Sequence, residues 1–330
     1  MWLLLGLWLT PSPASSAPWP GETWQEAENL TALDDNFTNN LSGAHWNPKT
    51  QTLWVCVNGP GKFLALVQDD EDPARKYKID TRDGLRGEWT PAGNPDLESI
   101  TQVDYAEDAV YVIDERTDRI LKYDTTVYGT APLLTSWNIR PFVPTSGSAG
   151  SEGLAFVPDA WLSARGFVDP AGAPYLSKNG MGGLMFVAHQ RGGHLYVFDL
   201  NPDDAAGVTF VGSYATNSHE SSGLEFDRST GKLYAWHNVS GNTIEELDLV
   251  STLRADGVRQ LNSLRVWDGP KGGNLEGIAM TPAAAYQHQI CITDDDNQDG
   301  AGLMCFKHFA PDRASVDRQV AASSDDAEQG

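Results

Sequence analysis

The 330-residue sequence contains few cysteines, few basic residues and, beyond its first residues, no long hydrophobic run. Three cysteines are too few for the disulfide framework of a small secreted domain. The 23 Lys and Arg against 45 Asp and Glu leave a formal net charge of −22. Nucleic acid and anionic membrane surfaces are therefore excluded as expected partners, because their phosphates would meet net repulsion. Cations are the partners that this charge favours.

The N-terminus is the only strongly apolar segment. Met1 to Leu9 reads MWLLLGLWL and is followed by small residues up to Ala17. The run is too short to span a bilayer, so residues 1–17 are predicted to be a signal peptide cleaved near Ala14 or Ala17, and the protein to be secreted. The alternative is an apolar N-terminus that packs on the domain. Four glycosylation sequons agree with a secreted glycoprotein, at Asn29, Asn36, Asn40 and Asn238. No membrane span is predicted.

The three cysteines leave two interpretations open. Cys291 and Cys305 lie on two apolar runs that flank an acidic loop. A disulfide across this hairpin is one hypothesis, and it leaves Cys56 free. Three buried thiols acting as small hydrophobic side chains are the other.

A helical period of apolar residues is also missing, and an internal repeat takes its place. Five segments share a short motif that is followed by an apolar, strand-like run. The second motif position recurs every 54 to 56 residues, with one interval of 70. These positions are Ser42, Glu98, Glu152, Ser222 and Glu276, and the runs that follow are LWVCVN, AVYVIDE, LMFVAHQ, KLYAWHN and QICITDD. The long interval is explained by an inserted loop over residues 159–182, rich in Gly, Pro, Ser and Ala.

Repeats of about 50 residues with three or four short strands predict an all-β protein, a β-propeller, because one such sheet buries both faces only when neighbours pack around a ring. Five repeats are visible, so we expect five or six blades. The propeller is predicted over residues 41–310. Residues 18–40 are a candidate for the strand that closes the ring. The tail 311–330 has the composition of a disordered segment.

The order of the motifs resembles the SdiA-regulated domain family of β-propellers. The supporting stretches are DLESITQVDYAEDAVYVIDERTDRILKYD, ESSGLEFDRSTGKLYAWHNVSGNTIEELDL and NLEGIAMTPAAAYQHQICITDDDN, and the resemblance covers residues 40 to 308. It implies a propeller with a calcium ion near the central axis. The sequence departs from the family pattern at Ala44 and Ser99. The last repeat, with EGIA and TDDDN, is also similar to phytase-type esterase propellers, which implies a metal-dependent hydrolase as an alternative.

The acidic motif residues are the main candidates for a site. Glu98, Glu152 and Glu276 occupy equivalent positions, and the innermost strands of a propeller bring such positions together in the central channel. Three converging carboxylates repel one another unless a cation neutralises them, and oxygen ligands favour calcium before magnesium. Asp114 and Asp294 end the second run of two repeats and are predicted as further ligands. The alternative is that each Glu accepts backbone N–H groups and only holds adjacent blades together.

Two histidines and an acidic loop are weaker candidates. His189 and His237 end the same run in adjacent repeats, and either could be a ligand, a general base or a hydrogen-bonded structural residue. Asp295, Asn297 and Asp299 fit the start of a calcium loop, D-x-N-x-D-G. The twelfth position of this loop is Phe306 rather than Glu, so a solvated hairpin turn is the competing interpretation.

Motifs for nucleophilic catalysis, phosphate binding and catalytic zinc are missing from the sequence. The expected function is a secreted propeller that binds a divalent cation and acts as a binding or scaffolding module for a protein, glycan or small-molecule ligand. The alternative is a metal-dependent esterase, lactonase or phosphoesterase, in which the three Glu are ligands and His189 or His237 is the base.

Overall fold

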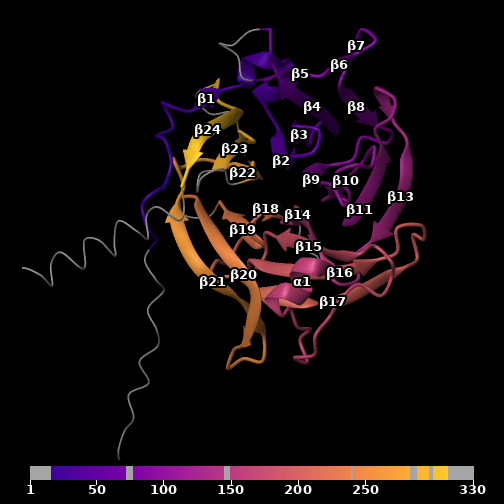
Figure 1. Ribbon diagram of the computed structural model, residues 1–330, viewed down its shortest axis with the longest axis vertical. Coiled ribbons are helices and arrows are strands. Elements are labelled where there is room, and N and C mark those ends of the chain that lie inside the picture. The colour runs from indigo at the N-terminus through magenta and orange to yellow at the C-terminus, as the bar shows by residue number, and fades with distance from the viewer. Residues whose placement is uncertain are drawn as a thin grey trace, which may run out of the picture.

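The computed structural model describes residues 16–71, 77–144, 149–238, 241–282, 288–296 and 300–310. Five sheets surround a central axis (Figure 1). The described secondary structure is β apart from the helix α1 (Asp159–Arg165) and two 3-10 turns, η1 (Thr31–Leu33) and η2 (Asp35–Thr38). Among these residues no helix is both long and apolar enough to cross a bilayer.

Each blade has a core of antiparallel strands, numbered from the axis outward. The first three blades are β2 (Leu41–Asn47), β3 (Thr52–Val57), β4 (Lys62–Gln68) and β8 (Glu88–Pro91); β9 (Leu97–Thr101), β10 (Ala109–Asp114), β11 (Arg119–Asp124) and β13 (Leu133–Asn138); and β14 (Ser151–Pro158), β15 (Gly183–His189), β16 (His194–Leu200) and β17 (Val208–Ala215). The other two are β18 (Gly223–Asp227), β19 (Lys232–His237), β20 (Thr243–Leu253) and β21 (Arg259–Asp268); and β22 (Leu275–Met280), β23 (His288–Asp294), β24 (Leu303–Phe309) and β1 (Glu28–Asn29).

Short strands extend the outer edges of the blades. β5 (Tyr77–Ile79) pairs with β4, and β6 (Thr81–Arg82) forms a small hairpin with β7 (Leu85–Arg86). β12 (Gly129–Ala131) leaves the second blade and pairs in parallel with β8 of the first. β17 pairs in parallel with β21, which joins the third and fourth blades into one eight-stranded sheet.

The innermost strands close the ring. β2 contacts β9, β9 contacts β14, β14 contacts β18, β18 contacts β22, and β22 contacts β2. The predicted β-propeller fold is therefore confirmed, and the described residues form five blades. The inserted segment 159–182 lies between β14 and β15 and carries α1.

Strand alternation explains why the repeats are apolar almost throughout. Five buried clusters each fill the space between two adjacent blades. In β3, Trp54 and Cys56 belong to the cluster facing the second blade, whereas Leu53, Val55 and Val57 face the fifth blade. Because successive side chains of a strand point to opposite faces, a strand between two blades has to be apolar on both faces. Alternation of polar and apolar residues is lost, and short continuous apolar runs remain.

The glycine of the repeated motif lets neighbouring inner strands approach each other near the axis. A Cβ on Gly277 would lie 2.3 Å from the Ser42 carbonyl oxygen and 2.6 Å from the Gly43 Cα on the adjacent strand. Thr293 bridges the same two strands, because its Oγ1 accepts the Gly277 N–H at 2.7 Å and donates to the Ser42 carbonyl at 2.9 Å. The repeat therefore keeps glycine where two backbones are in contact.

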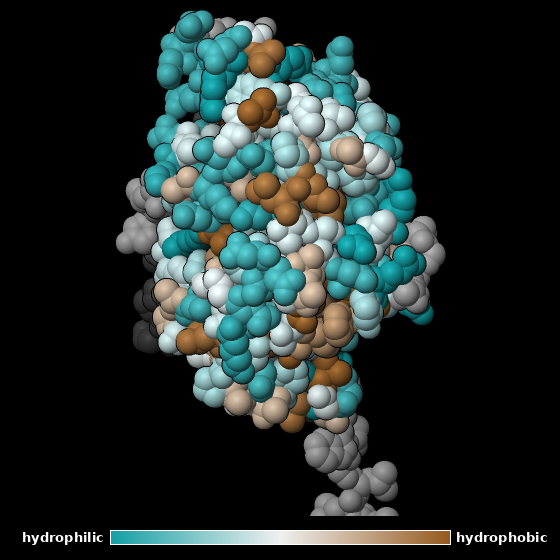
Figure 2. Space-filling model, turned by 90° about the vertical axis from the view of Figure 1, so that its right-hand side faces the viewer, coloured by the Kyte–Doolittle hydropathy of each residue, from teal (hydrophilic) through white to brown (hydrophobic). Residues whose placement is uncertain are grey.

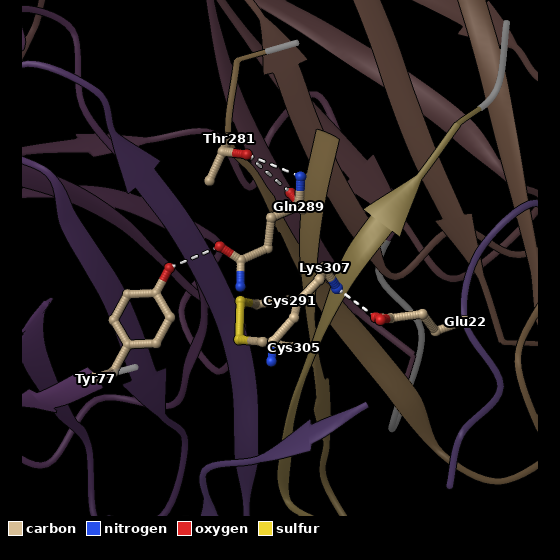
Figure 3. Close-up of a disulfide and its surroundings, with 7 residues drawn as sticks. All are labelled: Glu22, Tyr77, Thr281, Gln289, Cys291, Cys305 and Lys307. Carbon is tan, nitrogen blue, oxygen red and sulfur yellow. Dashed lines mark hydrogen bonds between the residues drawn. A yellow bond between two sulfur atoms is a disulfide. The ribbon is translucent and has the colours of Figure 1, made fainter. Parts of the chain in front are cut away.

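The fifth blade combines both ends of the described chain. β1 pairs with β24, with Glu28 opposite Cys305. A disulfide joins Cys291 and Cys305 across β23 and β24, and the Tyr77 hydroxyl of the first blade donates to Gln289 Oε1 at 3.0 Å (Figure 3). Cys56 is free and buried. Of the two hypotheses for the cysteines, the structure contains the disulfide.

The outer surface is mixed in character. Figure 2 shows the side of the ring on which β13 lies, with hydrophobic residues in several groups separated by hydrophilic ones. Leu133 and Leu134 on β13 are about half exposed. The hydrophobic side chains that face solvent on this side are thus dispersed rather than gathered over the whole blade.

A single carboxylate anchors the inserted segment. Asp199 on β16 is fully buried, and it accepts hydrogen bonds from the Tyr175 hydroxyl (3.2 Å), the Ser177 hydroxyl (2.9 Å) and the backbone N–H groups of Lys178 (2.7 Å) and Asn179 (3.3 Å). Hydrogen bonds to a charged acceptor are among the stronger ones in proteins. The loop therefore depends on a residue of the neighbouring strand.

We expect Asp199→Ala to destabilise the protein by about 3 kcal/mol, because it leaves buried donors without an acceptor. Urea unfolding measures the loss, and limited proteolysis should cut within residues 159–182 of the variant first. Asp203→Ala removes an exposed acid of the following turn and serves as the control. Equal protease resistance of the two variants would contradict the anchoring role.

Candidate metal centre

Three layers of equivalent residues surround one end of the axis. The innermost layer is the second motif position near the start of each inner strand, and all five side chains are buried: Ser42, Glu98, Glu152, Ser222 and Glu276. The next layer lies two residues earlier in each repeat: Asn40, Asp96, Gly150, Glu220 and Asn274. The third follows the second strand of each blade: Asn58, Glu115, Gln190, Asn238 and Asp295.

Backbone hydrogen bonds fix the second and third layers against each other. The Glu115 N–H donates to the Asp96 carbonyl at 3.0 Å, and the Asp295 N–H donates to the Asn274 carbonyl at 3.1 Å. The same bond recurs between Gln190 and the Gly150 carbonyl at 3.0 Å. The repeated backbone geometry therefore delivers a polar side chain from each of two turns to the rim of the channel.

Six carboxylates gather at this end of the axis, and we call them the axial acid cluster: Asp96, Glu98, Glu115, Glu152, Glu276 and Asp295. Ligand oxygens of Asp96, Glu98 and Glu115 lie within 4.8 Å of one another. Glu98 is buried, whereas Asp96 and Glu115 are half-buried. The cluster thus extends from the buried inner layer to the partly exposed rim.

Burial and mutual repulsion raise the pKa values of these acids. Burial, followed by the charge of Glu115, raises the pKa of Glu98 to about 8. The pKa of Glu152 lies well above its usual range because of burial first and then the charges of Glu98 and Glu276. The pKa of Glu276 is raised in the same way, by burial and then by Asp295 and Glu98. Near neutral pH the cluster therefore holds protons unless a cation replaces them.

Glu276 has one satisfied and one unsatisfied oxygen. The Asn274 side-chain amide donates to Glu276 Oε1 at 3.0 Å and to Asp295 Oδ2 at 3.3 Å. Glu276 Oε2 is buried and has no hydrogen-bond partner among the residues that the structure describes. A buried carboxylate oxygen without a donor is costly, and a cation would satisfy it.

Glu115 occupies the space that a missing side chain leaves. A Cβ on Gly150 would lie 2.2 Å from Glu115 Cγ, so the third blade contributes no acid in the second layer and the second blade extends into its place. There Glu115 hydrogen bonds to Glu152, which lowers the pKa of Glu115 against the raising effects of burial and Asp96. Two carboxyl groups in such contact share a proton or a cation.

The structure brings the predicted trio of Glu98, Glu152 and Glu276 into one electrostatically coupled group. The competing prediction is that these acids hold blades together through backbone N–H groups. Between the fifth and first blades Thr293 makes those bonds instead, and the donor to Glu276 is a side-chain amide.

Asp114 and Asp294 have other partners. Asp114 accepts from the Asp96 N–H at 3.0 Å and from the Thr117 hydroxyl, which stabilises a turn. Asp294 is fully buried and pairs with Lys271 at 2.8 Å. In both repeats it is the next residue that enters the cluster.

An irregularity in strand register accounts for that difference of one residue. The pairing of β9 with β10 shifts between Ile113 and Asp114, and the pairing of β22 with β23 shifts between Leu275 and Ile278. A shift of one residue moves side chains to the opposite face, and the sequence does not reveal where it occurs.

Asp295 lies at the axis rather than in an isolated hairpin turn. Asn58 Nδ2 donates to its Oδ1 at 3.4 Å, and burial followed by Asp296 raises its pKa. Asn297 and Asp299, the other candidates of this loop, lie outside the described residues.

Both candidate histidines have partners on both ring nitrogens. His189 is buried, its Nδ1 accepts the Arg191 N–H at 3.0 Å, and its Nε2 lies 3.1 Å from the Pro144 carbonyl oxygen. Burial lowers the pKa of His189 to about 4, so the ring is neutral near pH 7.

His237 lies between Ser221 Oγ (3.0 Å) and the Glu220 carbonyl (2.7 Å) on Nδ1 and Glu245 Oε2 (3.1 Å) on Nε2. The grouping resembles a Ser-His-Glu triad in composition, but Ser221, His237 and Glu245 are all buried. Its position within the fourth blade fits a structural bond network.

Sequence reasoning did not select Asp96, Glu115 or Asn274 as site residues. A signal was present, since the position two residues before the acidic motif residue is polar in four of the five repeats. The contribution of Glu115 depends on the absence of a side chain at Gly150, a residue of another blade.

No known protein family matches the chain, and no curated protein matches it in sequence. Among solved structures it is similar to one titled "Crystal structure of Nidogen/Laminin Complex", with 12% identity, 78% of this chain and 76% of that chain covered, and a TM-score of 0.40. It is also similar to the periplasmic gluconolactonase PpgL of Pseudomonas aeruginosa, with 15% identity, 75% and 60% covered, and a TM-score of 0.39. Membership of the SdiA-regulated family stays a prediction, and the fold assignment rests on the closed ring of this chain: a five-bladed β-propeller.

Proposed function

We propose that this propeller binds one divalent cation, calcium before magnesium, at the axial acid cluster and acts as a secreted binding or scaffolding module. The observation that carries the proposal is the convergence of buried carboxylates with raised pKa values, among them the unpartnered Glu276 Oε2. Secretion is supported by the sequence of residues 1–17, of which Met1 to Ser15 lie outside the described residues.

The donor chemistry fits a hard cation. All six members of the cluster offer carboxylate oxygens, and calcium takes six to eight oxygen ligands in a flexible arrangement. Glu98, Glu152 and Glu276 would hold the ion from three different blades, with Asp96 and Glu115 at the rim. The bound cation would neutralise the repulsion and connect the second, third and fifth blades.

A binding module is favoured over a hydrolase. His189 and His237, the residues that could act as bases, have both ring nitrogens occupied by protein groups. Two pockets lie at the other end of the axis, and neither is lined by the acid cluster.

Calcium is expected to raise the melting temperature of the wild-type protein but to have little effect on Glu152→Gln, because the variant loses one charged ligand and the coupling it mediates. A ligand at one hundred times its Kd stabilises a protein by about 2.7 kcal/mol. Calorimetric melting with calcium and with excess chelator measures the effect.

Glu71→Gln is the matched control, because Glu71 is an exposed acid far from the motif positions. It should respond to calcium as the wild type does. A wild-type melting temperature that calcium leaves unchanged would show that the cluster is not a cation site. A response retained in Glu152→Gln would remove that residue from it.

A further inference from the structure

Two pockets open at the end of the axis opposite to the acid cluster. The inner strands all start at the cluster, so their far ends and the turns that follow form the other face. A pocket of about 100 Å³ lies between the first and second blades, and one of about 200 Å³ lies beside it near the axis. Tyr105 lines both pockets. Together they reach the lower end of the size range of small-ligand sites.

Two buried indole N–H groups belong to the smaller pocket. Trp54 on β3 and Trp89 on β8 both line it, with exposed fractions of 7% and 1%. Neither Nε1 has a hydrogen-bond partner among the described residues, and the two rings lie 5.3 Å apart. A buried donor without an acceptor costs about 1 to 3 kcal/mol. Two such donors in one pocket therefore indicate that a molecule with acceptor oxygens binds there.

The charges of the pocket distinguish between acceptor ligands. Asp80, Glu107 and Asp108 line it against a single guanidinium, Arg82, so the formal charge of the lining is −2. An anion would accept from the indoles but would be repelled by the carboxylates. A hydroxyl group both accepts from an N–H and donates to a carboxylate, so it suits both kinds of group.

We infer that this face binds a neutral, hydroxyl-rich ligand, a saccharide, with one hydroxyl-bearing edge accepting from Trp54 and Trp89. A volume of about 100 Å³ corresponds to about three water molecules, so it admits an edge of a sugar ring rather than the whole ring. The remainder would pass Tyr105 into the larger pocket, where Trp46 and Met280 offer apolar surface and Glu225 and Arg228 offer polar groups. This site is separate from the proposed cation site.

The test is an NMR titration of the full chain labelled with ¹⁵N in its tryptophans. The probes are the methyl glycosides of glucose, galactose, mannose and N-acetylglucosamine, with sodium chloride and inorganic phosphate as anions. We expect saturable shifts of the Trp54 and Trp89 indole N–H signals with at least one glycoside. Trp267 is the internal control, because its Nε1 also lacks a partner among the described residues but the residue lines neither pocket.

Trp54→Phe and Trp89→Phe assign the two signals, and each should lower glycoside affinity about fivefold or more, the equivalent of one lost hydrogen bond. If a variant does not fold, contacts between the two neighbouring rings assign the wild-type signals. Glycosides that move neither signal, or shifts caused only by chloride or phosphate, would overturn the proposal. Repeating the titration with chelator separates it from the cation site, since the saccharide shifts should persist.

Discussion

The stabilisation by calcium is expected to be several kcal/mol larger near pH 8 than near pH 5. Burial and the charge of Glu115 raise the pKa of Glu98 from 4.5 to about 8 in the folded protein, and the pKa values of Glu152 and Glu276 move in the same direction. A tenfold change in an acid's ionisation constant corresponds to about 1.4 kcal/mol. The cluster is therefore the largest pH-dependent contribution that we expect in this protein.

The sign follows from the direction in which these pKa values move. Below about pH 4.5 the acids are protonated in both the folded and unfolded protein, and folding carries no penalty from them. As the pH rises to about 8 the unfolded chain ionises freely, whereas the folded chain either retains the protons or ionises against repulsion. The free energy of unfolding of the metal-free protein should thus fall over this range. Calcium removes the penalty at high pH and competes with protons at low pH.

Calorimetric melting in chelator and in calcium at both pH values measures the difference. Glu71→Gln, with its exposed acid removed, should follow the wild type at every condition. A chelated protein that is equally stable near pH 5 and near pH 8 would contradict the raised pKa values. The same calcium response at both pH values would mean that the ion binds elsewhere.

Gly277→Ala is expected to destabilise the protein by about 3 kcal/mol or more, the upper part of the range for overpacking. The new Cβ would lie 2.3 Å from the Ser42 carbonyl oxygen and 2.6 Å from the Gly43 Cα. Both are backbone atoms of the neighbouring inner strand, so no side-chain rotation relieves the contact. Moving the strand would also disturb the two hydrogen bonds of Thr293 that join the fifth and first blades.

Urea unfolding at constant pH measures this loss. Gly272→Ala is the matched control, because no atom lies within 4 Å of the position of its Cβ. The control should be neutral or slightly stabilised, since alanine restricts the unfolded chain. Equal stability of the two variants would show that the inner strands can separate without loss.

The fold was predictable because it repeats. Five equivalent motifs, each followed by an apolar run, indicate sheets buried on both faces, and the same equivalence predicts that Glu98, Glu152 and Glu276 converge. The sequence favours Asp114 as a further ligand, whereas Glu115 enters the cluster, because a strand irregularity at Ile113 and Asp114 changes which side chain faces the axis.

Features that depend on pairs of blades were not predictable. Glu115 reaches Glu152 only because Gly150 lacks a side chain. The pocket with Trp54 and Trp89 depends on two strands of one blade and on turns of the next. Sequence periodicity reports what the repeats share, whereas these features arise where one repeat differs from its neighbour.

The joining of β17 to β21 gives the ring uneven mechanical properties. The third and fourth blades form one sheet, and β12 connects the first blade with the second by strand pairing. At the outer edges of the second and third blades, the described contacts are side-chain hydrogen bonds, such as those from the Trp137 indole to the carbonyls of Asn201 and Asp204. We expect slow breathing motions to begin at this seam, so that the propeller opens there as a clasp and not as five independent segments.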